Sequence, residues 1–180
     1  MVSIAALTFS LSLTGCEEKP AEGIPEEQLV FFQYEYINHA WGYMHNGWLI
    51  DSTGSVYCYE QPEYYAKADS MGYVNLEDLD RMISEYDTVC YVIEPSTLRS
   101  NAELIAPAAE GELSLPDNRM ADAGIRSYYA YLYDSDTQKY KRVLLLQEGD
   151  WEIINQSAAA NDLADWMKLL RKEIATGALD

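Results

Sequence analysis

Alternation of apolar and polar residues along the chain begins near residue 30. Over residues 30–37, aromatic and β-branched side chains fall on one side of an extended chain, while Gln33 and Glu35 fall on the other. A period of two predicts a half-buried strand. Two further apolar runs, residues 47–50 and 56–60, flank the turn-forming string Asp-Ser-Thr-Gly-Ser, which predicts a hairpin.

The apolar period becomes helical near residue 75. Apolar residues at helical spacing follow an asparagine that suits an N-cap, and acidic residues stand in the first turns, so we predict a helix over residues 75–86. Residues 88–93 read as a buried strand. Ser100 and Glu103 fit a capping box that opens a short helix. Residues 113–124 have no period and are expected to form a loop.

A second hairpin is predicted from residues 127–133 and 140–147, which flank a polar turn. Its register places three tyrosines on one face of the sheet, namely Tyr129, Tyr131 and Tyr133. Residues 151–154 form a short strand, and a helix with an apolar stripe begins at Ser157. The stripe consists of Leu163, Trp166, Leu170 and Ile174. Tight turns between strands predict an α+β domain, with an antiparallel sheet, helices on one face and a C-terminal amphipathic helix.

The N-terminus carries a different pattern. Residues 2–13 hold no charge and are mainly apolar, which is typical of the central region of a signal peptide and is too short for a permanent transmembrane helix. The string Leu13-Thr14-Gly15-Cys16 resembles the lipobox of bacterial lipoproteins. The resemblance implies cleavage before Cys16 and a diacylglyceryl group on its thiol, which would anchor the chain to the cell membrane on the extracytoplasmic side. The alternative is a buried N-terminal strand that ends in a cysteine.

These features divide the chain into three parts. Residues 1–15 are expected to be a signal peptide, and residues 16–27 a lipidated tether, because they are polar and contain two prolines. Residues 28–180 are long enough for a single globular domain.

Charge limits the partners of this domain. The chain of 180 residues has a net charge of −18, and residues 20–138 hold 21 acidic and 5 basic residues. Binding to nucleic acid depends on Lys and Arg at phosphates, so we expect no nucleic-acid partner. A basic protein partner is compatible with the charge, although a solvated acidic surface explains it equally well.

With Cys16 assigned to lipid, Cys58 and Cys90 remain. Both lie in strand-like segments, and an even pair in an exported domain can form a disulfide. Two buried free thiols are the alternative.

Catalytic and metal-binding motifs are absent from the sequence. His39 and His45 stand six residues apart, which suits no common metal or catalytic spacing, and we expect both to be surface-loop residues. Asp51 begins an Asp-Ser-Thr-Gly string that differs from the aspartic protease loop and lacks a second copy, so we interpret it as a turn. We therefore predict no catalytic residue, no metal and no cofactor.

One segment, residues 38–48, stands out by its concentration of rings and glycines. Aromatic faces beside imidazole and amide groups suit a sugar or peptide surface. The candidate binding residues are Trp41, Tyr43, His45 and Trp48. The alternative is that the tryptophans are core anchors and the glycines bend the chain between strands.

The leading hypothesis is a lipid-anchored, non-catalytic binding or accessory module that meets an unknown protein or glycan through exposed aromatic residues. A cell-envelope hydrolase is the alternative from another class. An inhibitor or immunity lipoprotein with a basic protein partner is the third.

Overall fold

The computed structural model describes residues 28–86 and 88–177. The expected signal peptide, the tether and the lipid attachment at Cys16 lie outside this part of the chain. The described residues form a nine-stranded sheet in which every named pair of neighbouring strands is antiparallel. The strands are β1 Val30–Asn38, β2 Met44–Asp51, β3 Ser55–Glu60, β4 Tyr73–Asn75, β5 Val89–Val92, β6 Asp117–Asn118, β7 Ile125–Asp134, β8 Lys139–Gly149 and β9 Trp151–Ile154.

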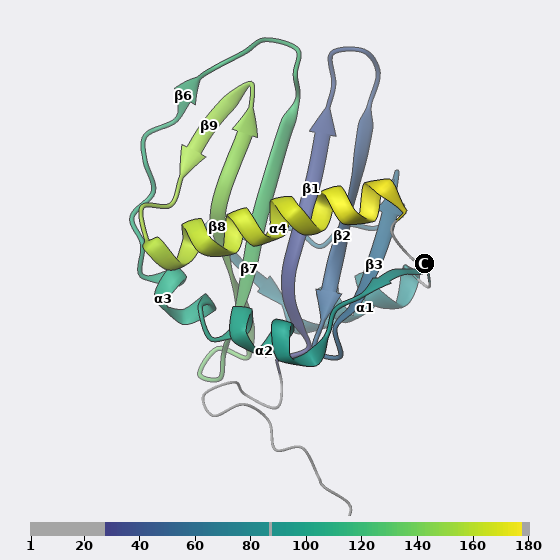
Figure 1. Cartoon of the computed structure of the whole chain (residues 1–180), viewed down its shortest axis with the longest axis vertical. Helices are drawn as coiled ribbons and strands as arrows, with labels where there is room; N and C mark the ends of the chain where they lie inside the picture. Colours follow the sequence, from purple (N-terminus) through teal and green to yellow (C-terminus); the bar gives the residue numbers. More distant parts are fainter. Residues whose placement is uncertain (1–27, 87, 178–180) are drawn as a thin grey trace, which may run out of the picture.

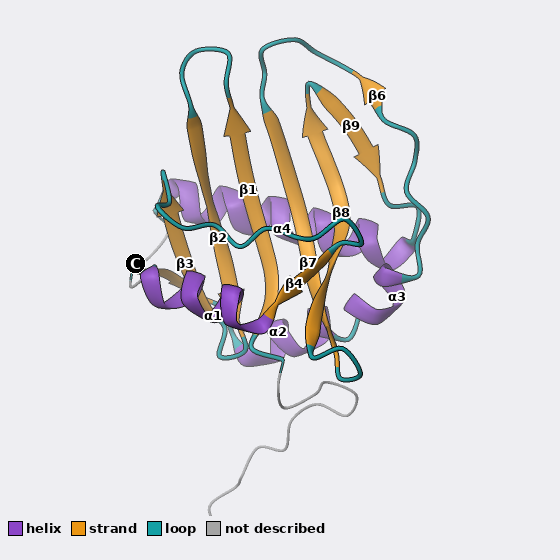
Figure 2. Ribbon diagram, turned by 180° about the vertical axis from the view of Figure 1, so that it is seen from behind, coloured by secondary structure: helices purple, strands orange, loops and turns teal. Residues whose placement is uncertain are grey.

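The strand order is β5-β3-β2-β1-β7-β8-β9-β6, and β4 pairs with β8 outside this path. The helices in the described residues are α1 Leu76–Glu85, α2 Pro95–Ala102, α3 Ile105–Ala109 and α4 Ala158–Thr176. Helix α4 runs across one face of the sheet, with α2 and α3 near its lower edge (Figure 1). Helix α1 and β4 lie on the opposite face of the sheet, which faces the viewer in Figure 2. The predicted α+β class, antiparallel sheet, two hairpins and C-terminal helix are confirmed.

The face beneath α4 is apolar. Phe32, Tyr34 and Trp48 from the strands pack in one core with Leu163 and Met167 of the helix. These helix residues share one side because they lie four apart. The predicted stripe is confirmed in part of its length: Leu163 and Leu170 are buried, whereas Trp166 and Ile174 are half-buried.

A second, smaller core lies on the opposite face, where α1 and β4 pack. It includes Leu79 and Met82 of α1, Val74 of β4, and the buried rings of Tyr131 and Tyr140. The helices are therefore divided between the two faces of the sheet. Helix α1 packs on one face, and α2, α3 and α4 pack on the other. This second layer makes β1 buried on both faces, so the expected half-buried strand is wrong: Gln33 and Glu35 are buried as well.

Two sequence expectations near the middle of the chain are also wrong. The segment expected as a buried strand is β5, a sheet edge with Val89 and Val92 exposed. The expected capping box does not start a helix, because α2 already begins at Pro95. Ser100 lies within that helix, and its hydroxyl donates to the carbonyl of Ser96.

Cys58 of β3 and Cys90 of β5 are joined by a disulfide, with 5.8 Å between their Cα atoms. The bond ties the edge strand to the sheet.

Asp51 closes the first hairpin as a turn residue: its carboxylate accepts hydrogen bonds from the backbone N–H groups of Thr53 and Ser55. None of the described helices combines the length and apolar character needed to cross a bilayer.

Candidate functional site

The four aromatic candidates of residues 38–48 do not share one surface. Trp41 is 83% exposed and Tyr43 is 54% exposed, and both stand at the tip between β1 and β2. His45 and Trp48 lie inside β2 and are 4% and 3% exposed. Side chains alternate along β2, so Trp48 lies beneath α4 while His45 points to the opposite face. The expectation of a surface-loop histidine is wrong for His45.

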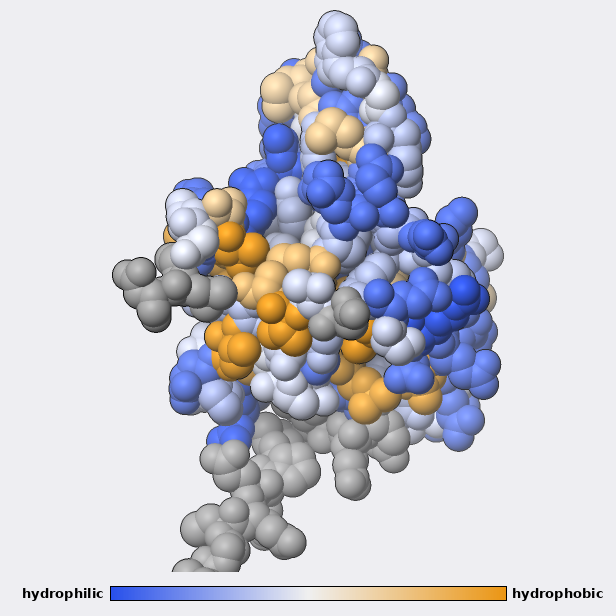
Figure 3. Space-filling model, turned by 90° about the vertical axis from the view of Figure 1, so that its right-hand side faces the viewer, coloured by the Kyte–Doolittle hydropathy of each residue, from blue (hydrophilic) through white to orange (hydrophobic). Residues whose placement is uncertain are grey.

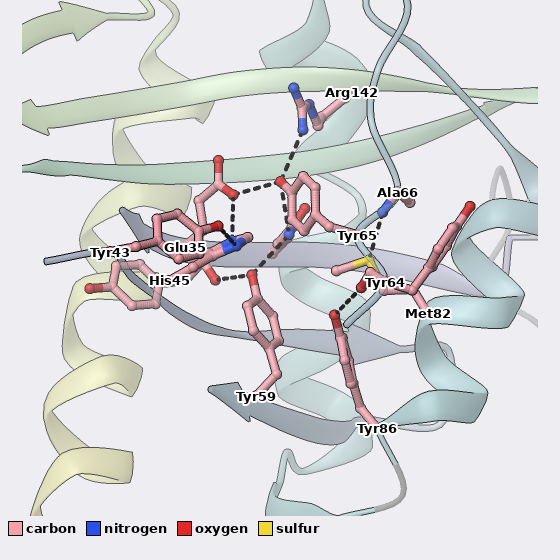
Figure 4. A network of polar contacts seen from close by, with 12 residues as sticks. Glu35, Tyr43, His45, Tyr59, Tyr64, Tyr65, Ala66, Met82, Tyr86 and Arg142 are labelled. Atoms are coloured by element: carbon pink, nitrogen blue, oxygen red, sulfur yellow. Dashed lines mark hydrogen bonds and ion pairs between the residues drawn. The ribbon is translucent and has the colours of Figure 1, made fainter. Parts of the chain in front are cut away.

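On that opposite face, β1 and β2 bury polar side chains in a connected network (Figure 4). At its centre, Glu35 Oε2 lies 3.4 Å from His45 Nε2. The hydroxyl of Tyr65, in the segment between β3 and β4, donates to the same oxygen at 2.6 Å. Arg142 of β8 donates to the Tyr65 hydroxyl at 3.2 Å. A cation, two rings and a carboxylate thus form one chain of contacts.

Gln33 extends the network toward the second core. Its amide donates to the hydroxyls of Tyr59 and Tyr65 at 3.1 and 3.4 Å. The hydroxyl of Tyr131 donates to the Gln33 carbonyl oxygen. Buried polar groups are costly unless they are paired, and these hydrogen bonds pair the Gln33 amide. His45 Nε2 makes only the 3.4 Å contact with Glu35 and has no hydrogen bond in the described structure.

The network also reaches the tip. The Tyr43 hydroxyl lies 3.1 Å from His45 Nδ1, within hydrogen-bond distance. Because His45 contacts Glu35 through its other ring nitrogen, the exposed Tyr43 is connected to the buried carboxylate through two contacts.

Charge in the network favours an ionised carboxylate. Burial acts to raise the pKa of Glu35, but the contacts with His45 and Tyr65 and the charge of Arg142 outweigh it, so the pKa is lowered. Burial raises the pKa of Tyr65, and the charge of Glu35 adds to this. The same two causes raise the pKa of Tyr129 to about 12. The phenols therefore remain protonated donors near neutral pH.

Next to the network lies a pocket of about 540 Å³, which we call the tip pocket. Residues of β1, β7 and β8 and of the loops at their upper ends line it. They are Glu35, Ile37, Asn38, His39, Ala40, Asp122, Gly124, Ile125, Ser127, Tyr129, Gln147 and Asp150. The lining contains three carboxylates and no Lys or Arg, so the pocket is rich in hydrogen-bond acceptors.

Three exposed apolar residues lie close in sequence to residues that line the tip pocket. Trp41 follows Ala40, Met120 precedes the lining loop, and Trp151 follows Asp150; Met120 and Trp151 are 53% and 44% exposed. Trp41 and Met120 lie in loops and Trp151 begins β9, and these segments lie at the same end of the sheet (Figure 2). We call Trp41, Tyr43 and Trp151 the rim aromatics.

The tip pocket can be compared with two common catalytic arrangements, a serine–histidine pair and a metal-binding cluster. Within the described residues no hydrogen bond joins Ser127, the one serine of the pocket lining, to a histidine. No group of three or more His, Cys, Asp or Glu side chains is placed to hold a metal in residues 28–86 and 88–177. What the pocket offers is a buried acceptor, hydroxyl and amide groups, and rings at the rim.

The sequence indicated part of this site. It singled out Trp41, Tyr43 and His45, but it missed Glu35, Tyr65 and Arg142. The signal for Glu35 was present, because a carboxylate within a strongly apolar strand must be either exposed or paired. No local pattern places Tyr65 or Arg142 beside it, since they come from distant segments.

No family model, curated protein or solved structure matches the chain.

Proposed function

We propose that this chain is a lipid-anchored, extracytoplasmic binding protein that takes a glycan in the tip pocket. The proposal rests on the exposed rings of Trp41 and Tyr43, which follow the lining residues His39 and Ala40 in the chain, and on the buried Glu35 carboxylate in the lining. The lipobox-like string that ends at Cys16 supports the anchor.

A glycan fits the chemistry of the pocket. Sugar hydroxyls donate to carboxylate and amide oxygens, which Glu35, Asp122 and Gln147 supply. Aromatic rings present a flat apolar face to the C–H side of a sugar, and the rim aromatics provide such faces. Because Glu35 is held by His45 and Tyr65, it is already oriented before the ligand arrives.

The hydrolase alternative receives less support. Glycoside hydrolysis requires a carboxyl group that is protonated at working pH, and such an acid has a raised pKa. The pKa of Glu35 is lowered. The inhibitor alternative depends on an acidic patch that meets a basic protein, whereas the exposed rim aromatics lie close in sequence to residues that line a concave pocket.

The test is binding of the purified domain, from residue 24 onward, to cell-wall polysaccharide and to an array of glycans. We expect Trp41→Ala to weaken binding by about tenfold or more, since stacked rings are frequent hot spots. Leu115→Ala is the control, because Leu115 is 88% exposed and, unlike Trp41, is not adjacent in sequence to a residue of the pocket lining. Equal binding by wild type and Trp41→Ala would reject the glycan site.

Lipidation has a separate test. Cys16→Ala should leave the precursor uncleaved and unlabelled by radioactive fatty acid, because the thioether forms on that thiol. Label in the variant would reject the anchor while leaving the binding proposal unaffected.

A further inference from the structure

A groove of about 700 Å³ lies on the face of the sheet that carries α4, between the last turns of that helix and strands β2 and β3. Arg171, Ile174 and Ala175 border it from the helix, and Trp48 and Cys58 border it from the strands. Figure 3 views the molecule from this side, where apolar side chains gather between hydrophilic margins. The groove shares no lining residue with the tip pocket.

Two buried donors near the groove lack acceptors, one on the lining residue Trp48 and one on Tyr128, which lies outside the lining. Trp48 Nε1 and the Tyr128 hydroxyl are buried and have no hydrogen-bond partner in the described structure. Their rings pack on either side of Tyr34, at centroid distances of 5.6 and 5.2 Å. A buried donor without an acceptor is destabilising, and most such groups in proteins are paired.

Arg171 adds a cation at the same place. Its guanidinium lies 5.5 Å from the Tyr34 ring, and Nη1 donates to the Tyr34 hydroxyl at 3.4 Å. A guanidinium carries five N–H donors, yet no ion pair to Arg171 occurs within residues 28–86 and 88–177. Lys172 borders the groove beside it, and Glu60 is the acidic side chain of the lining.

We propose that this groove binds a small amphipathic carboxylate, with the carboxylate at Arg171 and the apolar part against Ile174, Ala175 and the Cys58–Cys90 disulfide. A carboxylate supplies the acceptors that Arg171 lacks, and Arg–carboxylate pairs are among the strong hydrogen bonds of proteins. Trp48 lines the same groove, so its indole signal should respond when a ligand occupies it. Within a chain whose net charge is −18, the groove lining is an exception, because it holds Arg171 and Lys172 against the single carboxylate of Glu60.

The test is a titration of the domain with octanoate, compared with octanamide, which has the same chain and no charge. The four tryptophans give four indole N–H signals in a ¹⁵N-correlated NMR spectrum, and Trp48→Phe identifies the signal of Trp48. We expect octanoate to move the Trp48 signal in a saturable manner. Octanamide should bind at least about tenfold more weakly, since it loses a charged hydrogen-bonded pair.

Two substitutions on α4 test whether Arg171 is the residue that binds the carboxylate. Arg171→Gln should weaken octanoate binding by about tenfold, to the level of octanamide. Lys168→Gln is the control, because it removes the same charge from the same helix outside the groove, where Lys168 pairs with Glu148. If Arg171→Gln does not fold, two other measurements test the proposal. Lys172→Gln should weaken octanoate binding, and the wild type should bind octanoate more tightly than octanamide. Equal affinities for the two probes, an unmoved Trp48 signal, or equal losses in Arg171→Gln and Lys168→Gln would each overturn the proposal.

Discussion

On the face of the sheet beneath α4, strands β1 and β2 bury Phe32, Tyr34 and Trp48 in an apolar core. On the opposite face, the same two strands bury Gln33, Glu35 and His45 in a network of directed contacts. The first face is stabilised by removal of apolar area from water, which has no preferred direction. The second depends on partners at fixed positions, because unpaired buried polar groups are destabilising. A position can therefore be equally buried on either face and still respond differently to substitution.

The largest effect is expected from the apolar face. Trp48→Ala should lower the free energy of unfolding by about 3–5 kcal/mol, through lost burial and the cavity left behind. Urea unfolding measures this difference, with Trp48→Phe as the control that retains a ring. A loss under about 1 kcal/mol would show that the face beneath α4 does not depend on this side chain.

The disulfide packs at the edge of the same face. In the chain-entropy model, closing its 32-residue separation contributes about 3–4 kcal/mol, so the double variant Cys58→Ala/Cys90→Ala should be less stable by roughly that amount. Intact mass provides the direct check: the oxidised domain should be lighter than the reduced domain by two hydrogens. Two thiols that react with an alkylating reagent without denaturant would refute the bond.

On the polar face, a substitution should lower the free energy of unfolding because it removes a hydrogen-bond or ion-pair partner. Glu35→Gln keeps the side-chain volume but removes the charge that pairs with His45 and Arg142, and we expect a loss of about 1–3 kcal/mol. The exposed Glu63→Gln is the matched control. Similar unfolding midpoints for both variants would mean that the network is energetically neutral.

The pH dependence sharpens the same comparison. The pKa of Glu35 in the folded protein lies below its ordinary value of 4.5. A lowered pKa gives stability that is present above the ordinary value and is lost as the pH falls through the folded value. The stability difference between wild type and Glu35→Gln should therefore shrink in acid, and urea unfolding at several pH values measures it. A difference that grows as the pH falls would contradict the assignment.

The smallest effect on stability is expected at the tip. Trp41→Ala should change the free energy of unfolding by about 0.5 kcal/mol or less, because the side chain is 83% exposed. Thermal unfolding of this variant beside Trp48→Ala compares two tryptophans seven residues apart in sequence. A large loss in Trp41→Ala would indicate that the ring is a structural anchor and would remove it from the rim.

Alternation of side chains in β1 and β2 correctly placed Phe32 and Tyr34 on one face and Gln33 and Glu35 on the other. It could not reveal that the polar side is covered, because the covering residues, such as Tyr65 and Met82, come from segments later in the chain. The hairpins and α4 were predictable because their signals are local. The edge position of β5 was not, since an apolar run has the same appearance in a central strand and in an edge strand. The same limit explains the site: Trp41 was visible in sequence, whereas the partners of Glu35 were not.

The most direct test of the proposed function uses the four tryptophan indole groups together, because two lie at the tip pocket end of the sheet and two pack in the apolar core beneath α4. Trp41 and Trp151 are exposed at the tip, while Trp48 and Trp166 pack in the apolar core beneath α4. In an NMR titration with fragments of cell-wall glycan, we expect the indole signals of Trp41 and Trp151 to move with saturation while those of Trp48 and Trp166 stay in place. Glycan that moves only the signals of Trp48 and Trp166, or none of the four, would contradict the tip pocket as the binding site.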